Sequence, residues 1–452
     1  MSAYTPLAPA RRSTTGRILT WTSGIVSFSI LAYLILVIAH QFAVPPPAHR
    51  LVIVQDVPLP DGLAKNAQDA TSLAPGVELQ FDAFDFQAYD APTHRLFIAR
   101  TGPNPDDMTL NRIPFDPKYD GNVVVLDTVQ TKVIGRVAAP QVSGIIDAPD
   151  LHKVFAADSQ DNILYDINVN TMQIEGQIQL PDLDGPDAIG YDPVDHRIFV
   201  SDTGSPADVT KTGNVDRKNE NIAVIDALHD KLLGLVNFGF LPLLGGEQAP
   251  VTQPGNIPTY GHDVGHNDYD LGHDYVTSQI AANADSPNAY ILPPPHTAEF
   301  IAINALTMKI DKRIVLPAYC STPHGMNIDR EQHVAFVACT DFNPQAGLFA
   351  NLLRVDLRTM TVIPTDPATV RLGEGPDLVR VDLSAHLLFV ACGGGVTIFD
   401  EKSGEFHRLG LNFVARGAHS IAINEQTQQM YFPIFAGGLP LLRVTRYNPF
   451  GV

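Results

Sequence analysis

The sequence predicts an all-β fold: a seven-bladed β-propeller preceded by one N-terminal transmembrane helix. Three observations favour this prediction. Only 17% of the 452 residues are charged, whereas Gly (34) and Pro (36) are abundant, a balance typical of turn-rich β proteins. A two-hairpin pattern recurs along the chain. An uncharged apolar segment stands apart from this pattern near the N-terminus.

The N-terminal segment predicts a membrane anchor. Residues 18–39 contain 22 residues without a charge, enough to cross a bilayer as a helix. Arg11, Arg12 and Arg17 precede them, and no Lys or Arg follows before Arg50, so the positive-inside bias keeps the N-terminus cytoplasmic. A cleaved signal peptide is the alternative, although its apolar core would be unusually long. We expect a single-pass protein of the cell membrane with its propeller outside the cytoplasm, divided into a cytoplasmic tail (1–17), a signal anchor (18–43), a Pro-rich spacer (44–50) and the propeller (51–450).

The repeats predict the blades. "GPDAIGYDPVDHRIFVSD" (185–202), "TPHGMNIDREQHVAFVAC" (322–339) and "GPDLVRVDLSAHLLFVAC" (375–392) share one pattern of strand, tight turn and strand. Residues 83–100, 143–158 and 417–434 fit the same pattern, and a second hairpin follows most copies. Two hairpins make a four-stranded unit, and such units arranged radially make a propeller.

A seventh copy lies in "GHDVGHNDYDLGHDYVTS", where Gly261, His262 and Asp263 take the positions of Gly185, Pro186 and Asp187. Asp268 follows five residues later, and "YVTS" then matches "FVSD". The last copy lacks a fourth strand, while "HRLVIVQDVPLP" near residue 50 is a strand without a repeat. Pairing these two segments would close the ring and remove both free edges.

At this point the chain resembles the YVTN-type, YncE-like seven-bladed propellers over essentially all of residues 50 to 450. "FVSDTG", "FVACTD" and "FVACGGG" stand where that family has its Tyr-Val-Thr-Asn strand. The resemblance implies the fold. It leaves function open, because that family includes surface-layer and binding proteins, and propeller lactonases and lyases share only the architecture.

Residues that open the first strand of each repeat form the candidate metal site. In a propeller these positions meet at one mouth of the central channel. The second repeat offers Val142, and the other six offer side chains that bind metals: Asp85, Asp187, Asp263, His324, Asp377 and His419. Imidazoles with carboxylates suit Zn, Mn or Fe, and carboxylates alone suit Ca. The alternative is a hydrated polar funnel without an ion.

The remaining histidines receive a different interpretation. His94, His196, His333 and His386 each follow a turn Asp by four residues, and this regularity indicates a structural role in the turn. We expect His266 and His273 to be incidental neighbours of Asp263.

The extra chain length falls on the mouth that carries the Asp/His positions. Four second-to-third-strand connections are long, and so is the stretch before Tyr260. Long loops in a compact fold are usually functional, and tolerance of insertions is the alternative. The candidate ligand-binding residues on this face are Asp202, Tyr260, His262, Thr340, Asp341 and Phe342.

Three cysteines allow one disulfide at most. Antiparallel pairing would bring Cys320 and Cys339 together, so a bridge between them is a candidate. Cys392 occupies the position that matches Cys339 in the next repeat, and we expect it to be a buried free thiol.

Composition and motifs narrow the function. A net charge of −19 without a basic cluster argues against nucleic acid, and no haem-attachment, phosphate-loop or nucleophile-elbow motif occurs. The leading hypothesis is an extracytoplasmic propeller that binds a small molecule, glycan or protein on its insertion-rich face, with a divalent ion at the channel mouth. The alternatives are a metal-dependent hydrolase or lyase and a structural envelope protein.

Overall fold

The computed structural model describes residues 50–59, 83–102, 122–159, 161–181, 183, 185–202, 221–238, 260–282, 298–340, 349–401, 406–415, 417–436 and 439–451. Nearly all of them belong to one unit, Leu51–Pro449. No helix among them is long and apolar enough to cross a membrane. The predicted anchor (18–43), the tail before it and all but the last residue of the spacer lie outside the described residues.

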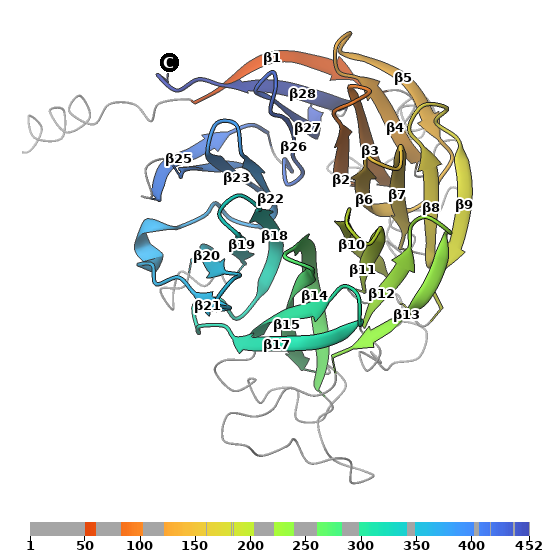
Figure 1. Cartoon of the computed structure of the whole chain (residues 1–452). Coiled ribbons are helices and arrows are strands. Elements are labelled where there is room, and N and C mark those ends of the chain that lie inside the picture. The colour runs from red at the N-terminus through yellow and green to blue at the C-terminus, as the bar shows by residue number, and fades with distance from the viewer. Residues whose placement is uncertain are drawn as a thin grey trace, which may run out of the picture. The chain divides into compact units, whose positions relative to one another are not determined.

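The described strands of this unit form seven four-stranded antiparallel sheets arranged as blades around a ring (Figure 1). In six blades the strands follow chain order from the innermost outward. The first three blades are β2 (Ala83–Asp90), β3 (Arg95–Gly102), β4 (Asn122–Asp127), β5 (Lys132–Val137); β6 (Val142–Ala148), β7 (Lys153–Asp158), β8 (Ile163–Asn168), β9 (Ile174–Gln179); and β10 (Pro186–Asp192), β11 (Arg197–Asp202), β12 (Asn221–Asp226), β13 (Lys231–Asn237).

The next three blades have the same order, and a short 3-10 helix, η3 (Pro367–Thr369), lies between the fifth and sixth. They are β14 (Tyr260–Asp270), β15 (His273–Ala282), β16 (Ala298–Asn304), β17 (Lys309–Val315); β18 (Pro323–Asp329), β19 (Val334–Cys339), β20 (Asn351–Asp356), β21 (Thr361–Val362); and β22 (Pro376–Asp382), β23 (Leu387–Cys392), β24 (Gly395–Asp400), β25 (His407–Phe413).

The seventh blade joins the two ends of the propeller chain, as predicted. Its inner strands are β26 (Ala422–Asn424), β27 (Gln429–Ala436) and β28 (Leu439–Tyr447), and its outermost strand is β1 (Leu51–Pro58). Strand β1 pairs along its length with β28, from Leu51 opposite Tyr447 to Pro58 opposite Leu441. The Arg443 guanidinium reinforces this pairing with two contacts to the Asp56 carboxylate, of 2.7 and 2.9 Å.

The core lies between neighbouring blades. Each second strand places a buried aromatic ring at the same position, two residues after its start, where it packs against an adjacent sheet. Phe155 of the second blade, for example, shares an apolar cluster with Ile198 of the third, and Phe336 of the fifth shares one with Phe399 of the sixth. The seven rings are Phe97, Phe155, Phe199, Tyr275, Phe336, Phe389 and Tyr431.

The turn histidines have the structural role that their spacing predicted. His94, His196, His333 and His386 all adopt the left-handed backbone conformation, with φ between 50 and 56°. Histidine tolerates this region better than β-branched residues do. The Nδ1 atom of His196 lies 3.2 Å from the Tyr191 hydroxyl, which helps to hold the turn.

The cysteines also follow their prediction. Cys320 and Cys339 form a disulfide, and Cys392 is a buried free thiol whose pKa burial raises to about 11.

Candidate metal centre

The inner strands bring the candidate residues together around the ring axis. Neighbouring inner strands lie so close that a Cβ atom on Gly144 would stand 1.5 Å from the Asp187 carbonyl oxygen. Residues of opposite blades meet at the axis, where the rings of Phe86 in β2 and His266 in β14 have centroids 4.8 Å apart. Side chains that leave the inner strands toward the axis therefore reach one another directly.

A repeated β-bulge aims these side chains. In β10, Pro186 pairs with Asp202 and Ile189 with Val200, so two residues lie opposite one. Such a bulge turns a side chain away from the regular pleat. The same break occurs in the inner strands of blades one to six, and the residues that it displaces are Asp85, Ser143, Asp187, Gly265, His324 and Asp377, each with the residue after it.

Three side chains form a metal-competent cluster: His266, His324 and Asp377, from the fourth, fifth and sixth blades. The Asp377 Oδ1 atom lies 3.5 Å from His324 Nε2 and 3.7 Å from His266 Nε2. Ligands held at about 2.1 Å around one ion stand roughly 3.0–3.4 Å apart, so small adjustments would seat a metal. The His266 side chain is 3% exposed and its Nδ1 atom has no hydrogen-bond partner, which is unusual for a buried polar group.

His419 of the seventh blade contacts the other oxygen of the same carboxylate. Its Nδ1 atom lies 2.7 Å from Asp377 Oδ2, which leaves Oδ1 facing His266 and His324. Burial alone would raise the pKa of Asp377, but the His419 hydrogen bond and the charges of His324 and His266 outweigh it and lower the pKa to about 2. Asp377 is therefore an ionised, oriented donor. A hydrogen-bonded ligand carboxylate of this kind is common in metal sites.

Two further carboxyl groups stand beside the cluster. Burial raises the pKa of Asp85 well above its ordinary value, and the neighbouring charges of Asp187 and Asp377 add to the effect. Burial also raises the pKa of Asp187, to about 6, with His324 opposing and Asp377 supporting the shift. The Asp187 Oδ1 atom is buried without a hydrogen-bond partner. This side of the axis therefore offers carboxyl groups able to hold or accept a proton near neutral pH.

The structure corrects the alignment of the fourth blade. Strand β14 ends at Asp270 and β15 begins at His273, whereas four turn residues separate β10 from β11. This turn is therefore two residues shorter than the turn of the third blade. An alignment that assumes equal turn lengths matches Asp263 with Asp187, whereas the strand pairing shows that Gly265 occupies the position of Asp187. The side chain of Asp263 lies outside the described residues.

The prediction for His266 was therefore wrong, because this residue directly follows Gly265 and joins the cluster instead of being incidental. In the second blade the equivalent of Asp187 is Ser143, not Val142, which is buried. The Ser143 hydroxyl donates to the Pro186 carbonyl at 3.0 Å. A turn-length comparison among the repeats is the sequence signal that would have found His266.

The predicted ligand-binding residues have mixed placements. Asp202 is buried at the end of β11, opposite Pro186, and the Thr340 hydroxyl lies 3.1 Å from the Thr322 carbonyl and 3.0 Å from its hydroxyl. Both lie at the same strand ends as the cluster, so the long connections leave from this mouth. The side chains of Tyr260 and His262, and all of Asp341 and Phe342, lie outside the described residues.

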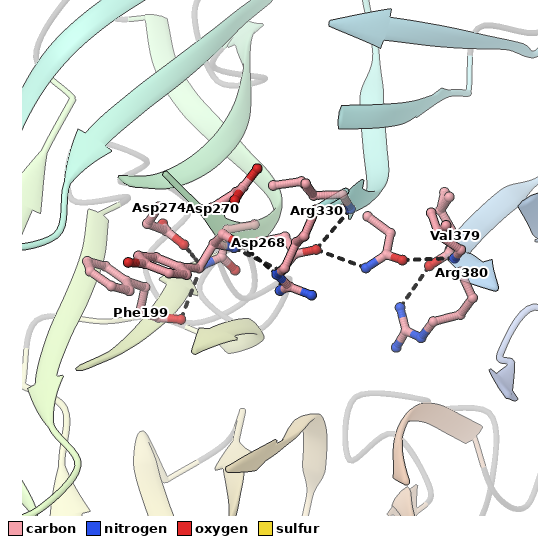
Figure 2. A network of polar contacts seen from close by, with 12 residues as sticks. Phe199, Asp268, Asp270, Asp274, Arg330, Val379 and Arg380 are labelled. Carbon is pink, nitrogen blue, oxygen red and sulfur yellow. Dashed lines mark hydrogen bonds and ion pairs between the residues drawn. The ribbon is translucent and has the colours of Figure 1, made fainter. Parts of the chain in front are cut away.

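A polar network extends along the inner strands next to the cluster (Figure 2). Asp268 of β14 accepts from Asn327 Nδ2 at 2.9 Å, from the Ile328 amide at 3.0 Å and from Arg330 Nη2 at 2.5 Å. Asn327 in turn accepts from the Val381 amide at 2.9 Å. These contacts join the inner strands of blades four, five and six, which carry the three members of the cluster, and so stiffen the scaffold that positions them.

The seven four-stranded sheets define the chain as a seven-bladed β-propeller. Solved structures with a similar fold are numerous, with 1359 matching chains. One is a chain of Kuenenia stuttgartiensis hydrazine synthase, with a TM-score of 0.57 and 12% identity over 83% of this chain and 99% of that one. This likeness shows the fold alone. No family model matches the chain, and no curated protein matches it. Membership of the YVTN-type, YncE-like family therefore stays a prediction.

Proposed function

We propose that the protein is a metal-binding propeller that holds a divalent transition metal with His266, His324 and Asp377 and takes a small oxygen-donor ligand at the open coordination positions. The observation that carries this proposal is the convergence of two imidazoles and one oriented carboxylate within 4.8 Å of one another. Two imidazoles and a carboxylate suit Zn, Mn or Fe, and the imidazoles disfavour Ca. The His324 side chain is 43% exposed, which supports access for a ligand from the mouth.

The cellular setting is part of the same proposal. We infer that residues 18–43 anchor the chain in the cell membrane and that the propeller lies outside the cytoplasm. The Cys320–Cys339 disulfide supports this, since disulfides persist mainly in oxidising compartments. The insertion-rich mouth would then meet its small molecule, glycan or protein partner there.

One observation favours catalysis as a second function. Asp187, with its pKa raised to about 6, lies near enough to His324 and Asp377 for their charges to act on it. A bound metal would polarise a substrate carbonyl and lower the pKa of a coordinated water. Asp187 would accept the proton of that water in hydrolysis, or the proton on the carbon next to the polarised carbonyl in elimination.

Metal analysis of the purified full chain tests the proposal. We expect a stoichiometric divalent transition metal, and its loss in His266→Ala and Asp377→Asn, because each substitution removes one of three donors. The surface pair of His229 and Asp226, 2.9 Å apart, supplies the control. His229 is 72% exposed, so His229→Ala should leave the metal content unchanged. A chain without metal after incubation with Zn, Mn and Fe(II), or one that keeps its metal in both variants, would contradict the proposal.

A further inference from the structure

Arg380 breaks a pattern that its neighbours share. In blades four and five the residue at this position of the inner strand is Asp268 or Asn327, and each accepts the backbone amide of the next inner strand, from Ile328 or Val381. In blade six the equivalent residue is Arg380. An arginine has no acceptor atom, so it cannot make this contact. The inner-strand scaffold therefore does not explain why a cation stands here.

The guanidinium of Arg380 has little to bind within the protein. Within the part of the chain that the structure describes, its one hydrogen bond goes to the Val379 carbonyl at 2.8 Å, the dashed contact drawn in Figure 2. Among the described residues no carboxylate lies within ion-pair distance of it. Asp268 is already engaged by Arg330 and Asn327, and Asp377 by His419. Its remaining N–H donors are accessible to solvent, so they are available to an anion that enters the channel.

Arg380 also lies near the metal-competent cluster of side chains. Arg380 lies three residues after Asp377 in β22, and Figure 2 shows its guanidinium on the side of the strand that faces the centre of the ring. Its charge also acts on Asp377 and on His266 of the fourth blade. Burial lowers the pKa of Arg380, and the charges of Asp268 and Asp377 counter the shift. Over the described residues, the axis therefore combines a cation that has no ion-pair partner with the metal-competent cluster.

We propose that Arg380 binds the carboxylate of a small hydroxy acid or oxo acid whose second oxygen reaches the metal at His266, His324 and Asp377. This proposal rests on the proposed function and names its ligand class. A guanidinium matches a carboxylate with two parallel hydrogen bonds. Phosphate esters fit less well, because the ionised Asp377 carboxylate at the axis repels a dianion more strongly than a monoanion.

Calorimetric titration of the full chain, with and without Co²⁺, tests this ligand class. The probes are lactate and 4-hydroxybutanoate, with acetate, lactamide and inorganic phosphate for comparison. We expect a hydroxy acid to bind the Co²⁺-loaded protein at least tenfold more tightly than acetate, lactamide or phosphate and to change the Co²⁺ absorption spectrum. Arg380→Gln should weaken this binding at least tenfold while Co²⁺ affinity is kept, and Arg380→Lys should restore part of it.

Arg330 supplies the matched control. It belongs to the same network, but its guanidinium is occupied by Asp268 and the Tyr269 carbonyl. Arg330→Gln should lower the melting temperature and weaken hydroxy-acid binding far less than Arg380→Gln does. Equal binding of lactamide and the acids, tighter binding of phosphate, or full affinity in a folded Arg380→Gln protein would overturn the inference. Failure of Co²⁺ to bind refutes the metal centre instead, and acid binding that still depends on Arg380 would then leave the carboxylate site standing alone.

Discussion

At the scale of single residues, burial decides which acids carry a proton. Glu401, just after β24, is 8% exposed, and its Oε1 atom has no hydrogen-bond partner. Its Oε2 atom accepts from Gln332 Nε2 at 3.1 Å. Burial raises the pKa of Glu401 to about 8, and the nearby charge of Asp329 adds to the shift. The folded chain therefore holds a proton that the unfolded chain releases.

This difference gives stability a defined pH dependence. Between the ordinary pKa of 4.5 and the folded value of about 8, the folded state binds more protons, so the free energy of unfolding falls as pH rises. Glu401→Gln removes the ionisation. We expect the unfolding free energy to be nearly unchanged at pH 5 and to be higher by roughly 2–4 kcal/mol at pH 8. Thermal melts at both values check this, with the exposed Glu175→Gln as control. An equal effect at both pH values would refute it.

At the scale of strands and turns, part of the site was predictable and part was not. The alternation of strand, Asp turn and strand located Asp187, His324 and Asp377 because their three repeats have equal lengths. His266 of the fourth blade was missed because the turn of this blade is two residues shorter. The alignment of the repeats therefore selected Asp263 in place of Gly265, which His266 follows. The bulge that orients these side chains is a feature of strand pairing, and no residue type in the sequence predicts it.

Close approach of inner strands leads to a prediction at this scale. A Cβ atom on Gly325 would lie 1.6 Å from the Asp377 carbonyl oxygen, so Gly325→Ala must push β22 away from β18. We expect a loss of about 3 kcal/mol in unfolding free energy and a weaker metal site, because Asp377 and His324 separate. Urea unfolding and metal titration measure the two effects. Gly394→Ala is the control, since nothing lies within 4 Å of its added methyl group. Equal stability and metal affinity in both variants would show that the strands can adjust.

At the scale of the whole molecule, ring closure was predictable from one unmatched strand and one incomplete repeat. The structure pairs them as β1 and β28. The particular ligand was not predictable, because a propeller shared by many solved chains fixes where strands meet and leaves their chemistry free. The lack of an ion-pair partner for Arg380 among the described residues became clear only from the contacts of its neighbours.

Two residues of β1 test the importance of closure. Val57 is 6% exposed and packs in the cluster between the seventh and first blades, whereas Ile53 of the same strand is 52% exposed. A buried unpaired charge is costly, so Val57→Asp should lower the unfolding free energy of the entire propeller by about 3 kcal/mol or more. Ile53→Asp should change it by less than about 0.5 kcal/mol. Urea unfolding followed by circular dichroism compares them. Similar curves for both variants would mean that β1 contributes little to closure.

The pairing of β1 with β28 also sets an order of events during synthesis. Of the described strands, the one that completes the seventh blade leaves the ribosome first, and Arg443, which contacts its Asp56, lies 387 positions later. Loop closure over such a span is slow, and it cannot begin until Leu439–Tyr447 has been made. Throughout that wait β1 is an exposed edge that could pair with another nascent chain. Interruptions in translation shortly before residue 439 should therefore be the ones that most strongly promote aggregation.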